Sequence, residues 1–416
     1  MPDATPSFTP MSTFGPVPDG WMWGTATAAH QIEGGNTNND WWEWEHTPGS
    51  GATESSGDAT DSWNRWREDL QLVKAMGLDC YRFSIEWSRI EPAHGEFSLA
   101  ALNHYRELMS AAHELGLKTS VTFHHFTTPT WAAKQGGWTN PEIVEWFAAF
   151  VEVAVKHLGE QIDIAATFNE PNVVALLGYQ MNIFPPGLNG GLGPFRAATE
   201  NFVAAHRRAR QVLKDGPGDF PVGLMLALSD VVVHPDGDPN SDGVRMMEMP
   251  TDDPANPFAW LMAGAYLEVA REDDYIGVQT YFTQHVGADF RELPTPADWR
   301  LTQMSWTFTP ESLGVTVRAA YAATGRPVIV TENGVASTDD AERIEYYSRS
   351  LAALRAAMDD GVDVRGFFAW SLLDNFEWAE GYRPEFGLVA VNLETFERTP
   401  KPSAAWFARI AAASRS

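Results

Sequence analysis

The stretch Asp163–Asn172, DIAATFNEPN, joins a short apolar run to a carboxylic acid that stands between asparagine and proline. Proline lacks a backbone donor and keeps the residue before it out of the α region, so Asn-Glu-Pro suits neither a strand nor a helix interior. The stretch therefore predicts a strand that ends abruptly on Glu170. Two questions follow: how many such strands the chain contains, and whether another of them ends on a second carboxylate.

The chain contains seven other short apolar runs. They are MWGTATAA at 22–29, CYRFSI at 80–85, KTSVTF at 118–123, VGLMLAL at 222–228, YIGVQTYF at 275–282, PVIVTE at 327–332 and VRGFFAW at 364–370, so that with the run at 163–168 there are eight. Stretches with apolar residues at i, i+3, i+4 and i+7 lie between most of them, for example at 66–78, 99–117 and 141–159, and this spacing predicts amphipathic helices. Gly116 and Gly159 are suitable helix stops.

Strands that alternate with helices indicate parallel β/α units. Eight such units in 416 residues predict an α/β fold that is a single (β/α)8 TIM barrel with inserted βα loops. An open doubly wound sheet is the alternative, but it would require a glycine-rich phosphate loop of the G-x-G-x-x-G type, which the sequence lacks. The Asp/Pro/Asn-rich stretch at 234–257 is expected to be a long loop.

The charge balance restricts the kinds of partner. The chain has 29 basic and 55 acidic residues, a net charge of −26, whereas nucleic acids and anionic membranes require basic surfaces. We therefore expect no nucleic-acid partner and no membrane partner. The acidity itself is most simply explained by solubility, and no apolar run is long enough to span a membrane.

The first residues differ in composition from the rest of the chain. Residues 1–16 are rich in proline and are expected to form a disordered arm, and residues 17–416 to form the barrel. The segment contains neither a basic residue nor an apolar core of the kind that secretory signals have, so a cytoplasmic location is the expectation. Cys80 is the single cysteine, which excludes an internal disulfide and is typical of a small buried apolar residue.

Polar and aromatic side chains follow the predicted strands at their carboxyl ends, where TIM barrels hold their active sites. In chain order they include Gln31, Glu33, Arg82, Glu86, Arg89, His124, His125, Asn169, Glu170, Gln279, Tyr281, Glu332, Asn333, Trp370, Asp374, Asn375, Glu377 and Trp378. Only the fifth run, at 222–228, has few polar or aromatic side chains at its carboxyl end. This convergence predicts a polar site at one end of the barrel.

Glu170 and Glu332 end the fourth and seventh runs, so the barrel would place them across its mouth from each other. Two facing carboxyl groups suit glycoside hydrolysis, in which one protonates the leaving oxygen and the other attacks as a carboxylate. Arg82 and Tyr281 could hold one of them ionised, while the like charge raises the pKa of the other. Each glutamate alone could equally be a helix-starting acid stabilised by the helix dipole.

Metal chemistry and thiol chemistry are the alternatives. His124 and His125 could bind zinc or manganese, but adjacent residues on a strand point to opposite faces, so at most one faces the interior. Cys80 lacks a base near it in sequence. We therefore expect neither a metal ion nor a cofactor. The clustered tryptophans suit either a core or a sugar platform.

Six motifs in order resemble glycoside hydrolase family 1, the β-glucosidase family, over about residues 18–407. They are MWGTATAAHQIEG, YRFSIEWSRIEP, VTFHHF, TFNEPN, VTENG and WSLLDNFEWAEGY. The resemblance implies a (β/α)8 barrel that hydrolyses β-glycosides with retention and without a metal or cofactor. Its substrate would be a small-molecule or oligosaccharide β-glycoside.

The resemblance also implies individual roles. Glu170 matches the general acid/base and Glu332 the nucleophile, while Arg82 and Tyr281 match the pair that orients the nucleophile. Asn169 matches the residue that binds the sugar 2-hydroxyl, and Trp370 the stacking platform. The residues that match those binding the other hydroxyls are Gln31, His125, Glu377 and Trp378.

Two departures concern sugar recognition. Phe126 stands where the family usually has tryptophan, and this removes an indole donor near the sugar 3-hydroxyl. Gln279 stands where the family usually has asparagine, and its longer side chain could move a hydrogen bond to the sugar or the nucleophile. Glu377 would repel a phosphate group, so free glycosides are expected rather than 6-phosphoglycosides.

Three activities fit this sequence. The first is exo-hydrolysis that releases a terminal β-D-glucosyl residue, or a galactosyl or fucosyl residue. The second is glycosyl transfer at the same site, and the third is a barrel that binds sugar without catalysis. The sugar epimer, the aglycone and the oligomeric state do not follow from the residues.

Overall fold

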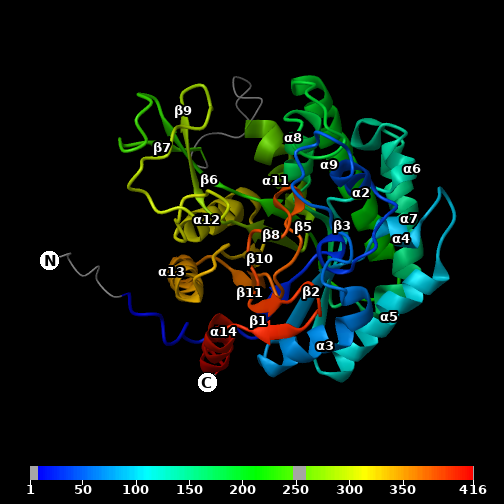
Figure 1. The fold of residues 1–416 in the computed structure, drawn as a ribbon, viewed down its shortest axis with the longest axis horizontal. Coiled ribbons are helices and arrows are strands. Elements are labelled where there is room, and N and C mark those ends of the chain that lie inside the picture. Colours follow the sequence, from blue (N-terminus) through cyan, green and yellow to red (C-terminus); the bar gives the residue numbers. More distant parts are fainter. Residues whose placement is uncertain (1–7, 247–258, 416) are drawn as a thin grey trace.

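The computed structural model describes residues 8–246 and 259–415. Eight parallel strands close into a barrel in the order β1-β11-β10-β8-β5-β4-β3-β2 (Figure 1). These barrel strands are β1 (Met22–Ala26), β2 (Cys80–Ser84), β3 (Lys118–His125), β4 (Ile164–Asn169), β5 (Val222–Ala227), β8 (Tyr275–Gln279), β10 (Val328–Asn333) and β11 (Val364–Trp370). Each coincides with one predicted apolar run, so the predicted (β/α)8 barrel is confirmed.

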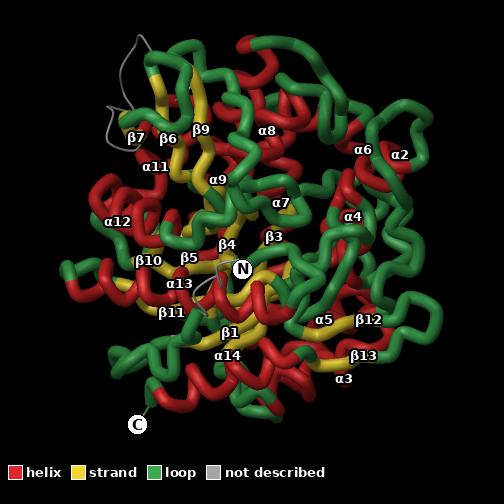
Figure 2. Tube along the Cα trace, turned by 60° about the vertical axis from the view of Figure 1, so that its left-hand side comes forward, coloured by secondary structure: helices red, strands yellow, loops and turns green. Residues whose placement is uncertain are grey.

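Helices surround the strands on the outside (Figure 2). The longer ones are α3 (Ser62–Ala75), α5 (Leu99–Glu114), α7 (Ile143–Leu158), α9 (Leu192–Asp215), α12 (Ser312–Thr324), α13 (Asp340–Asp359) and α14 (Pro402–Ala413). The shorter ones are α1 (Ala29–Ile32), α2 (Asp40–Glu45), α4 (Trp87–Ile90), α6 (Thr130–Ala133), α8 (Pro171–Tyr179) and α11 (Ala265–Val269). None of the helices among the described residues is both long and apolar enough to cross a membrane.

Helix α5 shows how local sequence sets an element. The Ser98 hydroxyl accepts a hydrogen bond from the Ala101 amide and so caps the first turn. Leu102, Tyr105 and Met109 are buried at helical spacing and face the barrel. The helix ends at Glu114, and Gly116 follows with a positive φ of 73°, as expected for a glycine helix stop.

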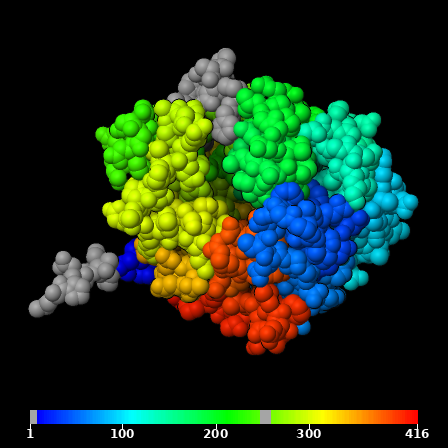
Figure 3. Space-filling view, turned by 45° about the horizontal axis from the view of Figure 1, so that its top comes forward, coloured from blue at the N-terminus to red at the C-terminus, as the bar shows by residue number. Residues whose placement is uncertain are grey.

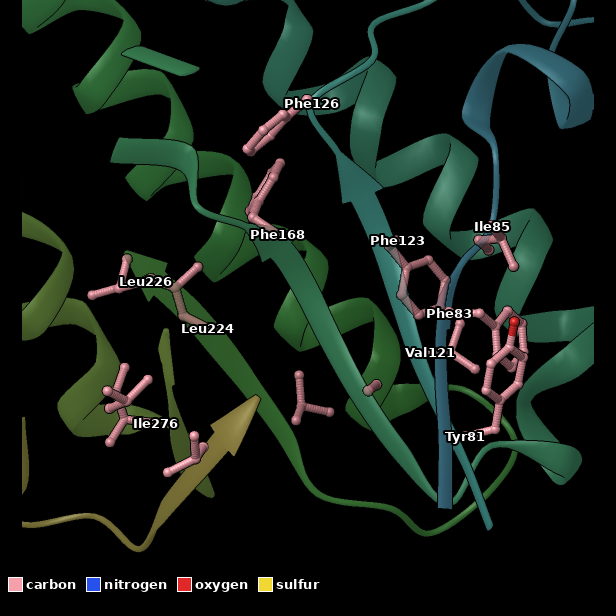
Figure 4. Close-up of a cluster of buried hydrophobic side chains, with 14 of the residues drawn as sticks. Tyr81, Phe83, Ile85, Val121, Phe123, Phe126, Phe168, Leu224, Leu226 and Ile276 are labelled. Carbon is pink, nitrogen blue, oxygen red and sulfur yellow. The ribbon is translucent and has the colours of Figure 1, made fainter. Parts of the chain in front are cut away.

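The core has an inner and an outer layer. Met22, Cys80, Ile164, Ile329 and Phe368 come from five barrel strands and form one buried cluster inside the barrel. The larger cluster lies between strands and helices, and Figure 4 shows part of it, with aromatic side chains on β2, β3 and β4. Cys80 is fully buried, and burial raises the pKa of its thiol, so it behaves as an apolar residue.

A small sheet extends from the barrel end. It contains β6 (Asp230–His234), β7 (Val244–Arg245) and β9 (Thr283–Gly287), in the order β7-β6-β9. The expected loop at 234–257 is therefore partly strand, because Val244 and Arg245 pair with β6 despite the surrounding Asp and Pro residues. Residues 247–257 of that range lie outside the described residues. A second small sheet pairs β12 (Val389–Val391) with β13 (Arg398–Pro400).

The expected N-terminal arm, residues 1–16, falls partly outside the described residues. Within residues 8–16, Met11 and Phe14 contact the rest of the protein, whereas residues 8–10 are exposed. Phe14 is 3% exposed and packs against Trp21 and Trp23, and the Met11 carbonyl accepts a hydrogen bond from the Trp406 indole. The apolar side chains of Met11 and Phe14 account for this packing. The proline-rich composition of the segment as a whole gave no indication of them.

A buried ion pair joins the C-terminal part of the chain to α3. The Arg398 Nε atom lies 2.9 Å from Asp69 Oδ1, both side chains are fully buried, and the Ser62 hydroxyl donates to Asp69 Oδ2 at 2.7 Å. Removing one member leaves the other charge buried without a partner. We expect Asp69→Ala to lower the free energy of unfolding by about 3–5 kcal/mol, measured by denaturant titration.

The matched control for this variant is Asp359→Ala. Asp359 pairs with Arg355 on the surface of α13 and is largely exposed. Exposed pairs contribute about 0–1 kcal/mol, so the control should unfold close to the unchanged protein. Equal destabilisation by the two variants would contradict the importance of the buried pair.

Candidate active site

A cavity of about 420 Å³ opens at the carboxyl ends of the barrel strands. Figure 3 shows the surface hollowed between the yellow residues that follow β8 and the green residues of α8 and its surroundings. Eight of the eleven predicted site residues line the cavity, namely His125, Glu170, Gln279, Tyr281, Glu332, Trp370, Glu377 and Trp378. Arg82, Asn169 and Gln31 are fully buried behind the cavity wall and contact the residues that line it.

Both glutamates follow irregularities in their strands. The pairing of β4 with β5 shifts register between Ala166 and Asn169, and the pairing of β10 with β8 shifts between Val330 and Glu332. Such bulges re-aim side chains and are common beside active sites. In β4 the shift leaves Thr167 pointing outward, where its hydroxyl lies 2.7 Å from His206 of α9, while Asn169 turns inward.

Three donors surround the Glu332 carboxyl group. Arg82 Nη1 lies 2.5 Å and Gln279 Nε2 3.0 Å from Glu332 Oε1, and the Tyr281 hydroxyl donates to Oε2 at 2.6 Å. Burial raises the pKa of this carboxyl group, whereas the Arg82 charge and the Arg82 and Tyr281 hydrogen bonds lower it. The donors favour the ionised form, as a nucleophile requires.

Glu170 has the opposite surroundings. It is 8% exposed, and among the described residues its carboxyl group accepts no hydrogen bond. Burial raises its pKa well above the ordinary value, and the charge of Glu332 raises it further. The protonated form is therefore favoured, as a general acid requires. The predicted division of roles rests on this contrast.

The backbone at Glu170 is unusual as well. Glu170 has φ 43° and ψ 53°, in the left-handed region that residues with a β-carbon seldom occupy. Pro171 then starts α8 as its first residue, a position that suits the fixed φ of proline. The carboxyl group thus stands at the turn between β4 and α8, beside the cavity.

A hydrogen-bond chain fixes the orientation of Asn169. Its side-chain oxygen accepts from Arg82 Nη2 at 2.6 Å and from Gln279 Nε2 at 2.8 Å. Its amide nitrogen then donates to His125 Nε2 at 3.1 Å. Burial and the Arg82 charge lower the pKa of His125 well below its usual range, so the ring is neutral and its proton lies on Nδ1.

Buried polar atoms near the cavity lack partners among the described residues. They include His125 Nδ1, Gln31 Oε1, Gln279 Oε1 and, on α8, Asn172 Oδ1. A buried polar atom without a partner costs about 1–3 kcal/mol, so a ligand that supplies the missing partners gains that much. One donor and three acceptors suit the hydroxyl groups of a sugar.

Glu377 and the neighbouring tryptophans complete this end of the cavity. Gln31 Nε2 lies 3.3 Å from Glu377 Oε2 and 2.8 Å from the Phe376 carbonyl oxygen. Burial, followed by the charge of Glu332, raises the pKa of Glu377 to about 8. The Trp370 ring lies 6.0 Å from that of His125 at an angle of 20°, and Trp378 lies 4.8 Å from Phe126.

The two histidines at the end of β3 point to opposite faces, as predicted. His124 lies outside the barrel among aromatic rings such as Phe168 and Trp138, and burial lowers its pKa to about 3. Only His125 faces the cavity. Within residues 8–246 and 259–415, no group of three or more His, Cys, Asp or Glu side chains is placed to hold a metal ion.

Other polar residues at the predicted strand ends lie apart from the cavity. Glu33 accepts from Arg89 Nε and from the Tyr105 hydroxyl, both at 2.7 Å. Glu86 accepts from the Ser88 and Thr127 hydroxyls. These groups stabilise loops around the barrel end and do not line the cavity.

The sequence reasoning missed the apolar lining. Phe126, which the sequence did indicate, lies in the cavity wall, but six residues from α8 and from the segments around β9 were not predicted, namely Val173, Leu176, Leu177, Phe282, Met304 and Trp306. Apolar spacing in α8 resembles that of a core-facing helix, so it carries no separate signal. The position of α8 directly after Glu170 could have indicated these residues.

Comparison with known proteins places the chain among sugar-cleaving enzymes. The family model described as glycosyl hydrolase family 1 matches residues 13–273 and 268–415. The chain is 33% identical to β-glucosidase A of Thermotoga maritima over 94% of this chain and 97% of that protein. It is 32% identical to a bifunctional β-D-glucosidase/β-D-fucosidase of Bifidobacterium breve over 95% of this chain and 98% of the relative.

Solved structures agree with these matches. The Thermotoga maritima β-glucosidase in complex with deoxynojirimycin superposes with a TM-score of 0.86 at 29% identity, covering 96% of this chain and 99% of that one.

Proposed function

The chain belongs to glycosyl hydrolase family 1 and is a glycosidase of the β-glucosidase type, and from this premise we propose that it releases terminal β-D-glucosyl residues with retention of configuration. The contrast between the two glutamates supports this proposal most strongly. Glu332 is held by three donors, whereas Glu170 has none among the described residues. Tolerance for fucosyl or galactosyl residues is part of the proposal, and the Bifidobacterium breve relative is named for both glucosidase and fucosidase activities.

The reaction has two steps. In the first, a Glu332 oxygen attacks the anomeric carbon while Glu170 gives its proton to the departing glycosidic oxygen, and a glycosyl ester of Glu332 forms. In the second, Glu170, now ionised, takes a proton from water, which attacks the same carbon and releases Glu332. Retaining enzymes place the two carboxyl groups about 5–5.5 Å apart, and we expect that separation here.

The other predicted residues act on the sugar. Arg82 and Gln279 fix the side chain of Asn169, which we assign to the 2-hydroxyl, and we assign the ring of Trp370 to the support of the sugar from below. His125 Nδ1 and Gln31 Oε1 are the free donor and acceptor for further hydroxyls. Glu377, with its raised pKa, is able to donate as well as accept.

Retention is tested by the anomer formed first. Hydrolysis of nitrophenyl β-glucoside, followed by proton NMR, should show β-glucose before mutarotation produces the α-anomer. Initial α-glucose would contradict the two-step mechanism. Parallel kcat/KM values for glucosides, galactosides and fucosides would establish the preferred sugar.

The pH dependence of kcat/KM should be bell-shaped. Activity requires protonated Glu170 and ionised Glu332, and burial raises the pKa of Glu170 well above its ordinary value. The rate should therefore fall as pH rises through the raised pKa and fall again as pH drops and Glu332 gains a proton. The acidic and alkaline limbs of the profile then give two apparent pKa values that describe Glu170 and Glu332 together rather than either residue alone.

Glu170→Gln tests this assignment. Glutamine cannot lose a proton in this range, so the alkaline limb should disappear when nitrophenyl β-glucoside is the substrate. The exposed Glu394→Gln is the matched control and should retain both limbs. An unchanged alkaline limb in Glu170→Gln would assign that limb to another group.

A further inference from the structure

The end of β4 departs from the alternation of a regular strand. Successive residues of a strand point to opposite faces, so an outward Thr167 would be followed by an inward Phe168 and an outward Asn169. Instead, Thr167 and Phe168 both face α9. The Phe168 ring lies 5.3 Å from that of Phe202, and the Thr167 hydroxyl contacts His206. These two successive outward residues are what return Asn169 to the cavity side of the strand.

A buried hydrogen-bond chain holds Thr167 in its outward position. The Thr167 hydroxyl lies 2.7 Å from His206 Nδ1, and His206 Nε2 lies 3.1 Å from Asp273 Oδ1. Arg210 Nε also lies 3.1 Å from the same Asp273 oxygen. A carboxylate only accepts hydrogen bonds, so His206 Nε2 is the donor, and Nδ1 of the neutral ring then accepts the hydrogen of the Thr167 hydroxyl.

The surroundings of this chain are mainly apolar. Thr167 lies in the layer between strands and helices, where Phe202, Ala205 and Ala209 of α9 are fully buried and where Figure 4 shows Phe168 among other apolar side chains. Valine would fill nearly the same space as Thr167 without a polar atom that requires a partner. Packing alone therefore does not call for a hydroxyl at this position.

The order of the three groups, hydroxyl, imidazole and carboxylate, is also that of many nucleophilic sites. Here Thr167 is 0% exposed, and His206 and Asp273 are each 1% exposed, so a substrate does not reach the hydroxyl. The chain instead joins β4 to α9 and to the residues that enter β8, since Asp273 lies two residues before that strand. It connects elements, and one of its ends lies three residues before Glu170.

We propose that His206 is a positioning residue for the general acid and acts through Thr167. The proposal rests on the β-glucosidase function and on the role of Glu170 in it. By holding Thr167 outward, His206 maintains the irregular end of β4 and so keeps the Glu170 carboxyl group where it gives its proton to the departing oxygen. A displacement of about 1 Å can lower a reaction rate about 10²-fold, so one buried hydrogen bond is enough to affect the acid.

Thr167→Val tests the proposal with a change of nearly constant volume. Methyl β-glucoside needs the proton of Glu170, whereas dinitrophenyl β-glucoside does not, so kcat/KM should fall at least about tenfold more for the methyl than for the dinitrophenyl substrate. Both substrates carry the same sugar, so an altered contact of Asn169 with that sugar cancels in the ratio.

The pH profile provides a second measurement on the same variant. Burial and the charge of Glu332 raise the pKa of Glu170, and a displaced carboxyl group loses part of both effects. The alkaline limb of kcat/KM for methyl glucoside should therefore move to lower pH in Thr167→Val. A variant that is merely less stable would lose activity on both substrates alike and keep the limb in place.

Two further variants serve as controls. Thr167→Ser keeps the hydroxyl and should preserve both the substrate ratio and the alkaline limb. Thr119→Val removes a hydroxyl that is equally buried in β3 and donates to the Gln161 carbonyl at 2.6 Å. Because Thr119 lies at the start of its strand, away from the cavity, this variant should leave the ratio and the limb unchanged.

His206→Phe assigns the effect to the imidazole. Phenylalanine keeps a ring but offers no partner to Thr167, so the substrate ratio should change at least as much as in Thr167→Val. Adding Thr167→Val to His206→Phe should change the ratio no further, since Thr167 then has no imidazole to hold it. Thermal melting shows which variants fold, and if His206→Phe does not, the comparison of Thr167→Val with Thr167→Ser still decides.

Two outcomes would overturn the proposal. One is a folded Thr167→Val whose substrate ratio and alkaline limb match those of the unchanged protein, and the other is an equal change in Thr119→Val. Both leave the β-glucosidase function standing, because the unchanged protein still hydrolyses both glucosides. Absence of hydrolysis of either glucoside by the unchanged protein would instead refute the function itself.

Discussion

Glu332→Ala will lower kcat for nitrophenyl β-glucoside by at least about 10⁴-fold, because the variant lacks the oxygen that attacks the anomeric carbon. Glu332→Gln should lose as much activity, although glutamine nearly preserves the volume and accepts hydrogen bonds through its amide oxygen. The pair of variants separates loss of chemistry from loss of shape, and initial rates measure both.

The control for both variants is Glu394→Ala, which alters an exposed glutamate far from the cavity lining. Azide provides a positive test, since in Glu332→Gly it fits the space that the side chain leaves and attacks from the same face. The product should be an α-glucosyl azide. Full activity in Glu332→Ala, or a β-azide from Glu332→Gly, would show that Glu332 is not the nucleophile.

Glu170→Ala will lower kcat/KM for alkyl glucosides by about 10²–10⁴-fold, the usual contribution of a positioned general acid. The loss should be much smaller for dinitrophenyl β-glucoside, because dinitrophenolate leaves without protonation. For that substrate the second step should become limiting, so a burst of dinitrophenol should precede slow turnover. Stopped-flow absorbance measures the burst.

Azide again distinguishes the roles. In Glu170→Ala the ester on Glu332 still forms, and azide should release it from the opposite face without needing a base. The product should be a β-glucosyl azide, the opposite anomer to that expected from Glu332→Gly. A loss of activity that is equal for alkyl and dinitrophenyl glucosides would contradict the assignment of Glu170 as the acid.

The barrel and most of its site could be predicted because both follow from local patterns. Parallel strands that are buried on both faces have nearly continuous apolar sequences, and each of the eight barrel strands lies within or overlaps such a run. Closed parallel barrels gather the residues that follow the strands at one end, so Glu170 and Glu332 could be placed together before their contacts were known.

Other features required the three-dimensional structure. The register shifts before Asn169 and Glu332 have no sequence pattern of their own, because they arise from the pairing of β4 and β10 with their neighbours. The packing of Phe14 against Trp23 could not be predicted, because the proline-rich sequence around Phe14 is typical of a disordered segment. The apolar lining of the cavity could not be predicted, because Leu177 and its neighbours on α8 have the same spacing whether they face a core or a cavity.

The order of strands around the barrel has a consequence for synthesis on the ribosome. β1 is synthesised more than 330 residues before β11, yet the two strands are neighbours, with Met22 opposite Gly366. Until β11 emerges, β1 and β10 each present an unpaired edge to other nascent chains. Glu332 would meanwhile lie beside an open edge, so catalytic competence should arise late in translation, together with closure of the barrel.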